Sequence, residues 1–127
     1  MICLIDTHAF LWWLGAPKRV IGEARETLQD STNRIYVSAA VAWEVAIKVN
    51  LGKLEATDIL ADFAEVLLNR GFRRLSISTE HAIRAGLLPR RHNDPFDRML
   101  IAQAQALNCP VISADSVFDS YGVRRIW

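Results

Sequence analysis

The sequence has few cysteines, no long apolar run and almost no net charge. Its only two cysteines, Cys3 and Cys109, do not need to pair, and we expect both to be free thiols in a reducing cytoplasm. No apolar stretch approaches the ~20 residues that a membrane-spanning helix needs. The N-terminus also lacks the basic start and the cleavage site of a secretion signal. We therefore expect a cytoplasmic protein that has no membrane partner.

The charge balance gives no general argument for nucleic-acid binding. The chain has 15 Lys and Arg against 14 Asp and Glu, a net charge of +1, whereas nucleic-acid-binding domains usually carry a basic excess. Basic side chains do gather in one stretch, which contains Arg84, Arg90, Arg91, His92 and Arg98. Such side chains contact phosphates, pair with the carboxylates of a protein partner, or face water, and the sequence leaves all three open.

Short apolar segments alternate with longer segments of helical periodicity along the chain. Strands are predicted at Met1–Ile5, Ile35–Ser38, Phe72–Ile77, Val111–Ser113 and Val123–Ile126. Helices are predicted at His8–Leu14, Ile21–Asp30, Ser38–Val49, Thr57–Leu68, Ser78–Leu87 and Asp94–Leu107. This alternation predicts a three-layer α/β fold with a mostly parallel sheet flanked by helices. The length suits one domain over residues 1–127.

Aspartates follow two of the predicted strands. Asp6 comes directly after the first strand, and Asp115 lies two residues beyond the fourth. Ligands of parallel α/β sheets bind beyond the carboxyl ends of the strands, so these side chains converge if the two strands are neighbours. Each aspartate alone is also explained as a helix N-cap, but their equivalent positions make that explanation weaker for the pair.

Glu44 is the one charged residue in the apolar segment Ala39–Ile47. A helix with so little polar surface is largely buried, and an ionised carboxylate there is costly without a partner. A metal ion or a basic side chain would offset that cost. A pair with Lys48 at i+4 explains Glu44 equally well.

A third acidic position lies at the start of the last predicted helix. Asp94 before Pro95 is typical of an N-cap followed by proline at the first helical position. Asp97 is not required by that cap and is the better site candidate, while Asp94 is a supporting residue. Thr7 and Ser113 lie beside site aspartates, where their hydroxyls would orient a carboxylate or a water; turn capping explains them as well.

The acidic set predicts a divalent-metal site. Carboxylates brought close together raise one another's pKa unless a cation compensates their charge. Oxygen ligands suit Mg²⁺ or Mn²⁺, and no zinc-type Cys and His spacing competes. Such ions orient a water and stabilise both oxygens of a phosphodiester during hydrolysis. We expect Asp6, Glu44, Asp97 and Asp115 to be catalytic, with Asp6, Asp97 and Asp115 as metal ligands.

At these residues the sequence resembles a PIN domain, and more narrowly the VapC-type toxin ribonucleases of toxin–antitoxin pairs. The matching segments are Leu4–Ala9, Ser38–Lys48, Gly52–Leu54, Asp94–Ala104 and Val111–Asp115. They occur in order, with suitable spacing, over nearly the whole chain. The ordered set is therefore more specific than any single segment.

The resemblance implies a parallel five-stranded sheet in the order 3-2-1-4-5, which puts the first and fourth strands side by side. The family's acidic positions correspond to Asp6, Glu44, Asp97 and Asp115, and Ser113 stands where the family often has threonine. The resemblance further implies cleavage of RNA with Mg²⁺ or Mn²⁺. It also implies a homodimer, and an antitoxin whose tail enters the site groove.

One helix suggests a partner independently of the resemblance. Trp12 and Trp13 are adjacent, so one side of a helix cannot bury both, and Phe10, Leu11 and Leu14 make the same segment apolar nearly all round. This pattern favours a protein interface, with burial in the core as the alternative.

Three other functions compete with a ribonuclease. The same crevice could serve a non-catalytic module that binds RNA or protein, but the complete acidic set argues against it. A receiver-like signalling domain requires a second acidic residue after the first strand and a lysine after the last strand. Here Thr7 follows Asp6 and no lysine follows Lys53, so this function is weakly supported. A DNA nuclease would use the same metal chemistry, and only the family resemblance favours RNA.

Overall fold

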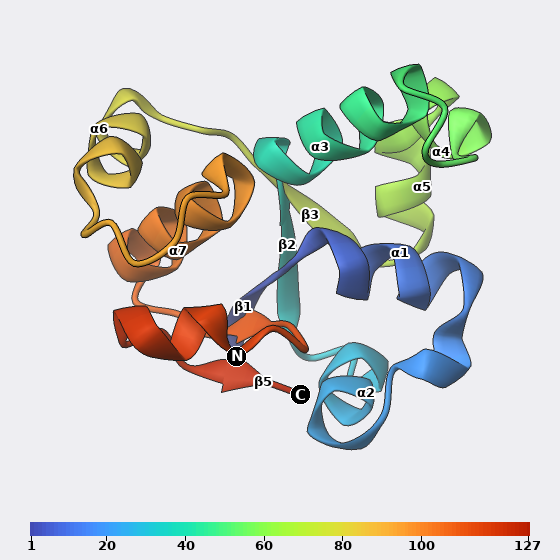
Figure 1. Cartoon of the computed structure of the whole chain (residues 1–127). Helices are drawn as coiled ribbons and strands as arrows, with labels where there is room; N and C mark the ends of the chain where they lie inside the picture. The colour runs from blue at the N-terminus through green and yellow to red at the C-terminus, as the bar shows by residue number, and fades with distance from the viewer.

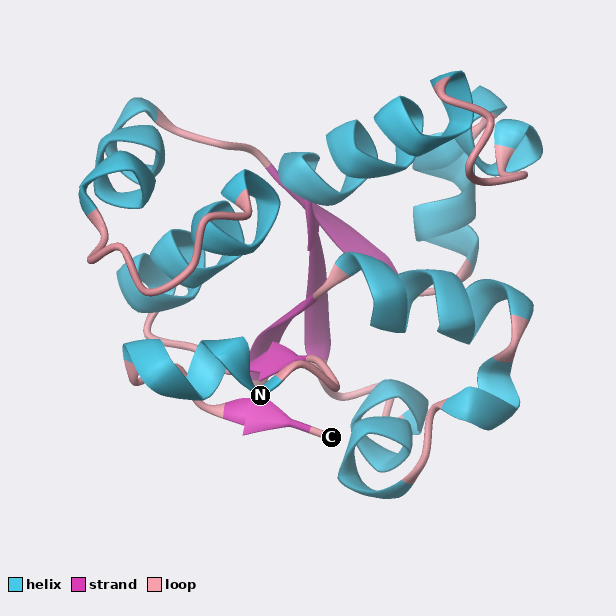
Figure 2. Ribbon diagram, viewed as in Figure 1, coloured by secondary structure: helices cyan, strands magenta, loops and turns pink.

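The computed structural model describes residues 1–127, and its centre is one parallel five-stranded sheet. The strands are β1 (Ile2–Ile5), β2 (Arg34–Ser38), β3 (Phe72–Leu75), β4 (Val111–Ile112) and β5 (Arg125–Ile126). Their order is β3-β2-β1-β4-β5, and every neighbouring pair is parallel. Figure 2 shows the sheet as a central layer between helices. The predicted α/β class and strand order are confirmed.

Helices cover both faces of this sheet. They are α1 (Thr7–Gly15), α2 (Gly22–Gln29), α3 (Ala39–Asn50), α4 (Thr57–Ala61), α5 (Phe63–Asn69), α6 (Thr79–Leu87) and α7 (Pro95–Leu107), with short 3₁₀ helices at η1 (Pro17–Arg19) and η2 (Ser116–Tyr121). Figure 1 shows α6 and α7 on the opposite side of the sheet from α1, α4 and α5. The N-terminal ends of α1, α3 and α7 come together beyond the carboxyl ends of the strands. None of the helices is both long and apolar enough to cross a bilayer.

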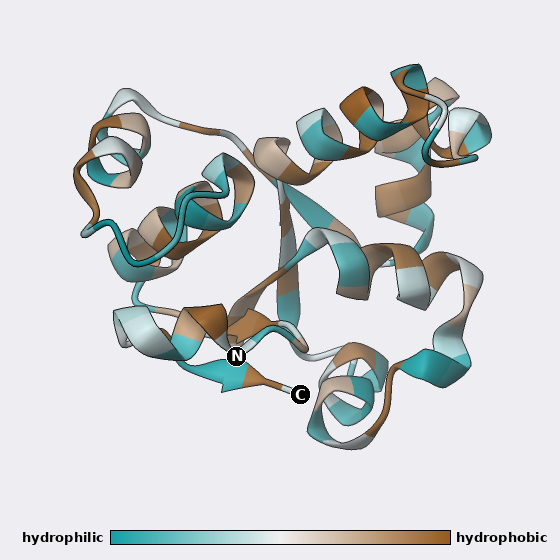
Figure 3. Ribbon diagram, viewed as in Figure 1, coloured by the Kyte–Doolittle hydropathy of each residue, from teal (hydrophilic) through white to brown (hydrophobic).

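The core explains why the first strand lacks any apolar–polar alternation. Cys3, Leu4 and Ile5 are fully buried because β1 lies in the middle of the sheet and is covered on both faces. Figure 3 shows hydrophobic residues along the central strands. Phe10 on α1 packs edge to face against Phe72 on β3, at 5.6 Å between ring centroids, which fixes α1 on the sheet.

One prediction about the helices is wrong, and the sequence does not predict the 3₁₀ helix η2. The single helix predicted at Thr57–Leu68 is broken at Asp62, whose φ of −130° and ψ of 46° are not helical. The break turns α5 so that Phe63 comes within 5.9 Å of Phe10, between ring centroids, and tertiary packing thus overrides the continuous pattern. No element was predicted at η2, where Phe118 and Tyr121 are both buried. Their spacing of three residues matches one turn of a 3₁₀ helix.

Trp12 and Trp13 on α1 are both half-buried against the core of the chain itself. The guanidinium of Arg19 lies 4.3 Å from the centroid of Trp12, and that of Arg25 lies 5.5 Å from Trp13. Each arginine thus makes a cation–π contact with one of the two rings. Packing within the chain therefore accounts for part of the burial of both tryptophans, and an interface on this helix stays a prediction.

Candidate active site

The carboxyl ends of β1 and β4 meet at Asp6 and Ser113. Leu4 pairs with Val111 and Ile5 with Ile112, and the Asp6 amide donates to the Ile112 carbonyl at 3.0 Å. The next side chains along both strands therefore face one another. The Ser113 hydroxyl donates a hydrogen bond to Oδ2 of Asp6. The first and fourth strands are therefore neighbours, which is the condition under which Asp6 and Asp115 come together at the carboxyl end of the sheet.

Asp6 is a carboxylate held in a nearly water-free position, since only 5% of the residue is exposed. Its Oδ1 accepts a hydrogen bond from the Ala9 amide at 2.8 Å, so Asp6 is the N-cap of α1. Burial raises the pKa of the Asp6 carboxyl above its usual value. The hydrogen bonds from Ser113 and Ala9 oppose that rise, and the charge of Asp115 adds to it. Asp6 thus combines a capping role with an incompletely compensated charge.

Asp115 lies near both Asp6 and Asp97. It caps η2 by accepting a hydrogen bond from the Val117 amide at 3.0 Å, and its own amide donates to the Ser113 hydroxyl at 2.9 Å. Its negative charge raises the pKa of Asp6 and also that of Asp97. The Ser113 hydroxyl therefore connects the carboxylate of Asp6 to the backbone of Asp115, and Asp115 links the other two carboxylates electrostatically.

Glu44 on α3 reaches the same edge of the sheet through Thr7. The Thr7 hydroxyl donates to Oε1 of Glu44 at 2.5 Å, which fixes Glu44 beside the residue that follows Asp6. Its Oε2 lies 2.9 Å from Nζ of Lys48, one helical turn away. Both explanations considered for Glu44 are thus present together: it lies at the candidate site, and it pairs with a basic side chain.

Asp97 is held at the first turn of α7 by two side chains. Asp94 caps the helix by accepting hydrogen bonds from the amides of Phe96 and Asp97, at 2.9 and 3.1 Å. Oδ2 of Asp97 lies 2.8 Å from Nε2 of His92. Burial raises the pKa of Asp97 from 3.8 to about 6, a rise that the hydrogen bond to His92 opposes and that the charges of Asp94 and Asp115 reinforce.

The sequence model of the PIN domain matches residues 3–123, which include all of these side chains. The chain belongs to the PIN domain family.

Relatives of this PIN domain include a curated protein and several solved structures. It is 39% identical over 62 residues to "Ribonuclease VapC16" of Mycobacterium tuberculosis, a match that covers 48% of this chain and 44% of that relative. The chain therefore matches less than half the length of the curated relative. Its fold is similar to that of a DNA-bound VapBC from Salmonella typhimurium, with a TM-score of 0.71, 18% identity and 98% and 96% of the two chains covered. It is also similar to VapBC2 from Rickettsia felis bound to a promoter DNA fragment, with a TM-score of 0.69, 15% identity and 98% and 97% covered.

The acidic side chains of this PIN domain suit a hard divalent cation, although no three His, Cys, Asp or Glu side chains stand together as a preformed ligand set. Mg²⁺ is commonly bound through one or two carboxylates and keeps several of its waters, so it needs no complete protein cage. The raised pKa values of Asp6 and Asp97 show that neither carboxylate is fully compensated in the folded chain. The donor set therefore fits a cation near Asp6, Asp97 and Asp115.

Two residues of this PIN domain acquire roles that the sequence did not reveal. His92 was identified only as one member of a basic cluster, whereas its ring contacts Asp97. The sequence leaves phosphate contact open for Arg98, but in the structure its guanidinium donates to five backbone carbonyls at the end of α6 and in the next loop. These are the carbonyls of Ala85, Gly86, Leu88, Pro89 and His92, at 2.8 to 3.4 Å. The contacts of Arg98 extend over residues 85–98, so no single residue of the sequence indicates them.

Proposed function

We propose that this PIN domain is a divalent-metal-dependent endoribonuclease. The observation that carries the proposal is that Asp115 lies close enough to both Asp6 and Asp97 for its charge to raise their pKa values, while Asp6 is buried and Asp97 is partly buried. The partial match to "Ribonuclease VapC16" supports RNA as the substrate. Metal-assisted hydrolysis does not itself distinguish RNA from DNA, so the choice of RNA depends on that relative and on the family.

Asp6, Asp97 and Asp115 are the residues that would hold Mg²⁺, with Mn²⁺ as an alternative. When bound, such an ion lowers the pKa of a water and stabilises charge on the phosphodiester oxygens. The chain's own residues prepare the site. Ser113 fixes one oxygen of Asp6, and Asp94 fixes the start of α7 and with it the backbone of Asp97.

Glu44 completes the proposed catalytic set at one side of these ligands. Its contact with Thr7 sets the distance between α3 and the end of β1, and Lys48 compensates its charge while the site is empty of substrate. We assign Glu44 the orientation of the attacking water or of the substrate, because Lys48 already compensates its charge, 2.9 Å from Oε2. Thr7 supports Glu44 in the way that Ser113 supports Asp6.

We further propose that the protein is the toxin of a type II toxin–antitoxin pair and that an antitoxin protein binds it. The support is structural: the similar solved chains come from VapBC proteins, and the likeness covers almost the whole length of both chains. A homodimer belongs to the same proposal. The alternative, a non-catalytic PIN-like module that binds RNA or protein, is not favoured, because it does not explain why carboxylates whose charge is incompletely compensated lie at this end of the sheet.

The decisive experiment compares wild type with Asp6→Asn on matched RNA and DNA oligonucleotides in the presence of Mn²⁺. Asparagine still caps α1, so the variant keeps the fold while it loses the charge. Asp58→Asn is the matched control, because Asp58 is exposed on α4, away from the sheet edge. We expect wild type and Asp58→Asn to cleave RNA and Asp6→Asn to be inactive. Equal cleavage by all three proteins would overturn the proposal, and cleavage of DNA alone would correct its substrate.

A further inference from the structure

Two aromatic side chains join the helices that carry Glu44 and Asp97. Trp43 on α3 and Phe96 on α7 pack edge to face, with 5.1 Å between ring centroids and 77° between ring planes. Each directly precedes one of the acidic residues in the sequence. Trp43 is nevertheless 59% exposed, although so large an apolar ring normally contributes most of its area to a core or an interface. Packing within the chain therefore does not account for Trp43.

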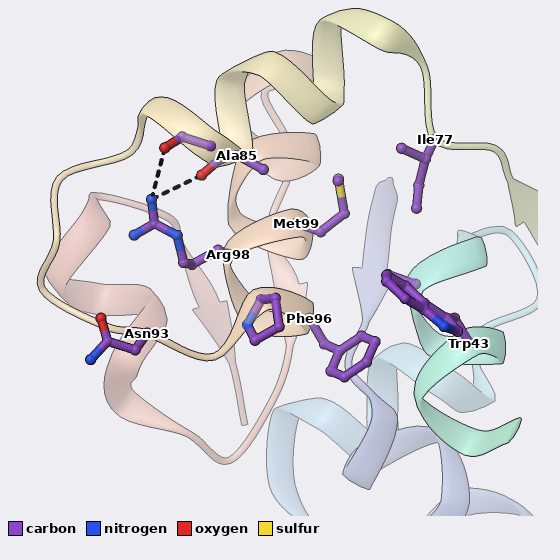
Figure 4. Close-up of a pocket in the computed structure, with 10 residues that line it drawn as sticks. Trp43, Ile77, Ala85, Asn93, Phe96, Arg98 and Met99 are labelled. Carbon is purple, nitrogen blue, oxygen red and sulfur yellow. Dashed lines mark hydrogen bonds between the residues drawn. The ribbon is translucent and has the colours of Figure 1, made fainter. Parts of the chain in front are cut away.

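The aromatic pair lines a cavity of about 250 Å³ between α3, α6 and α7. The apolar lining consists of Ala40, Trp43, Ile77, Ala85, Phe96 and Met99. Figure 4 shows the labelled members of this set arranged around the space, with Asn93 and Arg98 on the side of the α6–α7 loop. The cavity is smaller than the roughly 300–1,000 Å³ of sites for drug-sized ligands. It suits a single planar ring system.

The cavity is held open by contacts within the chain. Arg98, which lines it, directs its guanidinium into the carbonyls of α6 and the following loop, and Figure 4 shows two of these hydrogen bonds. The wall formed by Ala85 and Gly86 is thereby tied to α7 without any ligand. A preformed site loses less conformational freedom on binding, so its contacts contribute more fully to affinity.

We propose that this cavity binds one unstacked nucleobase of the RNA, adjacent to the phosphodiester that is cleaved. The inference depends on the proposed ribonuclease function and adds the site that selects the sequence. Single-stranded RNA is recognised by stacking splayed bases on aromatic rings, which Trp43 and Phe96 provide. Figure 4 shows Asn93 on the opposite side of the cavity lining from Trp43, with its amide pointing away from the two rings, so the rings alone supply the base contacts of this proposal.

A nucleobase fits these observations better than a helix of a protein partner. A docked helix needs a groove with anchors at i, i+3, i+4 and i+7, whereas the cavity is compact and has the volume for one ring. Its position also matters, because Trp43 and Phe96 sit next in sequence to two acids of the proposed site. The proposal places the phosphate of such a base beside those carboxylates.

The test measures RNA affinity in the inactive Asp6→Asn background, by fluorescence anisotropy with labelled single-stranded RNA. Trp43→Ala, Trp43→Phe and the control Ile83→Ala are added one at a time; Ile83 is an exposed apolar residue of α6 that does not line the cavity. We expect Trp43→Ala to weaken binding roughly tenfold to a hundredfold, the range for loss of one stacked base. Trp43→Phe should retain most of the affinity, and Ile83→Ala all of it.

A second arm identifies the bound group. A set of RNAs is made, each with one abasic nucleotide at a different position. For one of them the substitution Trp43→Ala should no longer change the RNA affinity, because the base that stacks on Trp43 is already missing. Equal sensitivity of all abasic RNAs would overturn the inference. Unchanged RNA affinity of Trp43→Ala would also overturn it. If the same variant shifts from dimer to monomer in sedimentation, the surface belongs to an interface with a second copy. If Mn²⁺-loaded wild type neither cleaves nor binds RNA, the proposed function itself fails, a result distinct from either of these.

Discussion

Replacing Asp97 by asparagine is expected to stabilise the metal-free protein at neutral pH while it abolishes cleavage. Burial raises the pKa of Asp97 from 3.8 to about 6, and its side chain is 23% exposed. A rise of about 2 pKa units corresponds to about 3 kcal/mol of lost folding stability, at about 1.4 kcal/mol for each unit. Asparagine keeps the shape and a hydrogen-bond acceptor for His92 but carries no charge.

The sign of the pH dependence follows from the raised pKa. Folded protein holds a proton on Asp97 more tightly than unfolded chain does, so the penalty is nearly absent at about pH 4 and complete above about pH 6. Urea unfolding in EDTA should therefore find Asp97→Asn more stable than wild type by up to about 3 kcal/mol at about pH 7.5, and nearly equal to it at about pH 4. Mn²⁺ should raise the melting temperature of wild type far more than that of the variant.

Two results would refute this reasoning. If Asp97→Asn is less stable than wild type in EDTA at neutral pH, the carboxylate is already compensated within the folded chain. If Mn²⁺ stabilises both proteins equally, Asp97 is not part of the metal site. Asp58→Asn serves as the control and should behave as wild type at both pH values, because Asp58 is exposed on α4.

Three further substitutions have defined outcomes. Ser113→Ala removes a hydrogen bond to the buried Asp6 carboxylate, so it should cost about 1–3 kcal/mol in urea unfolding near neutral pH and reduce cleavage; unchanged stability would mean that this hydrogen bond contributes nothing. Arg98→Lys loses most of the five carbonyl contacts and should destabilise by about 2 kcal/mol or more, with no change in the salt dependence of RNA binding; a shallower salt slope would instead show that Arg98 contacts phosphate. Phe10→Ala empties a fully buried site beside Phe72 and should cost about 3–5 kcal/mol, measured by calorimetric melting, and a loss below about 1 kcal/mol would contradict the core position.

Local chemistry in the sequence determined most of the elements that carry the candidate site. An apolar run that ends at Asp6 predicts a buried strand followed by a polar position, and the structure has β1 there with Asp6 as the N-cap of α1. Asp94 before Pro95 predicts the start of α7, and the observed cap is formed by Asp94. These features depend on residues within a few positions of one another, so they are readable without the fold.

Tertiary packing decided what local patterns could not. The break at Asp62 exists because Phe63 turns towards Phe10, which lies more than fifty residues away in the sequence. The 3₁₀ helix η2 forms where Phe118 and Tyr121 are buried, a consequence of the surrounding chain rather than of helix propensity.

The same division holds within the site. The strand ends point to Asp6 and Asp115, because acids after strands of a parallel sheet gather at one edge. Glu44 stands out as the one charge of an apolar segment, and Asp97 as an acid that the cap at Asp94 does not require. Their hydrogen-bond partners depend on the tertiary structure. Ser113 donates to Asp6, 107 residues away in the sequence, and Thr7 donates to Glu44, 37 residues away. The raised pKa values likewise arise from burial, which is a property of the packed chain and not of any segment.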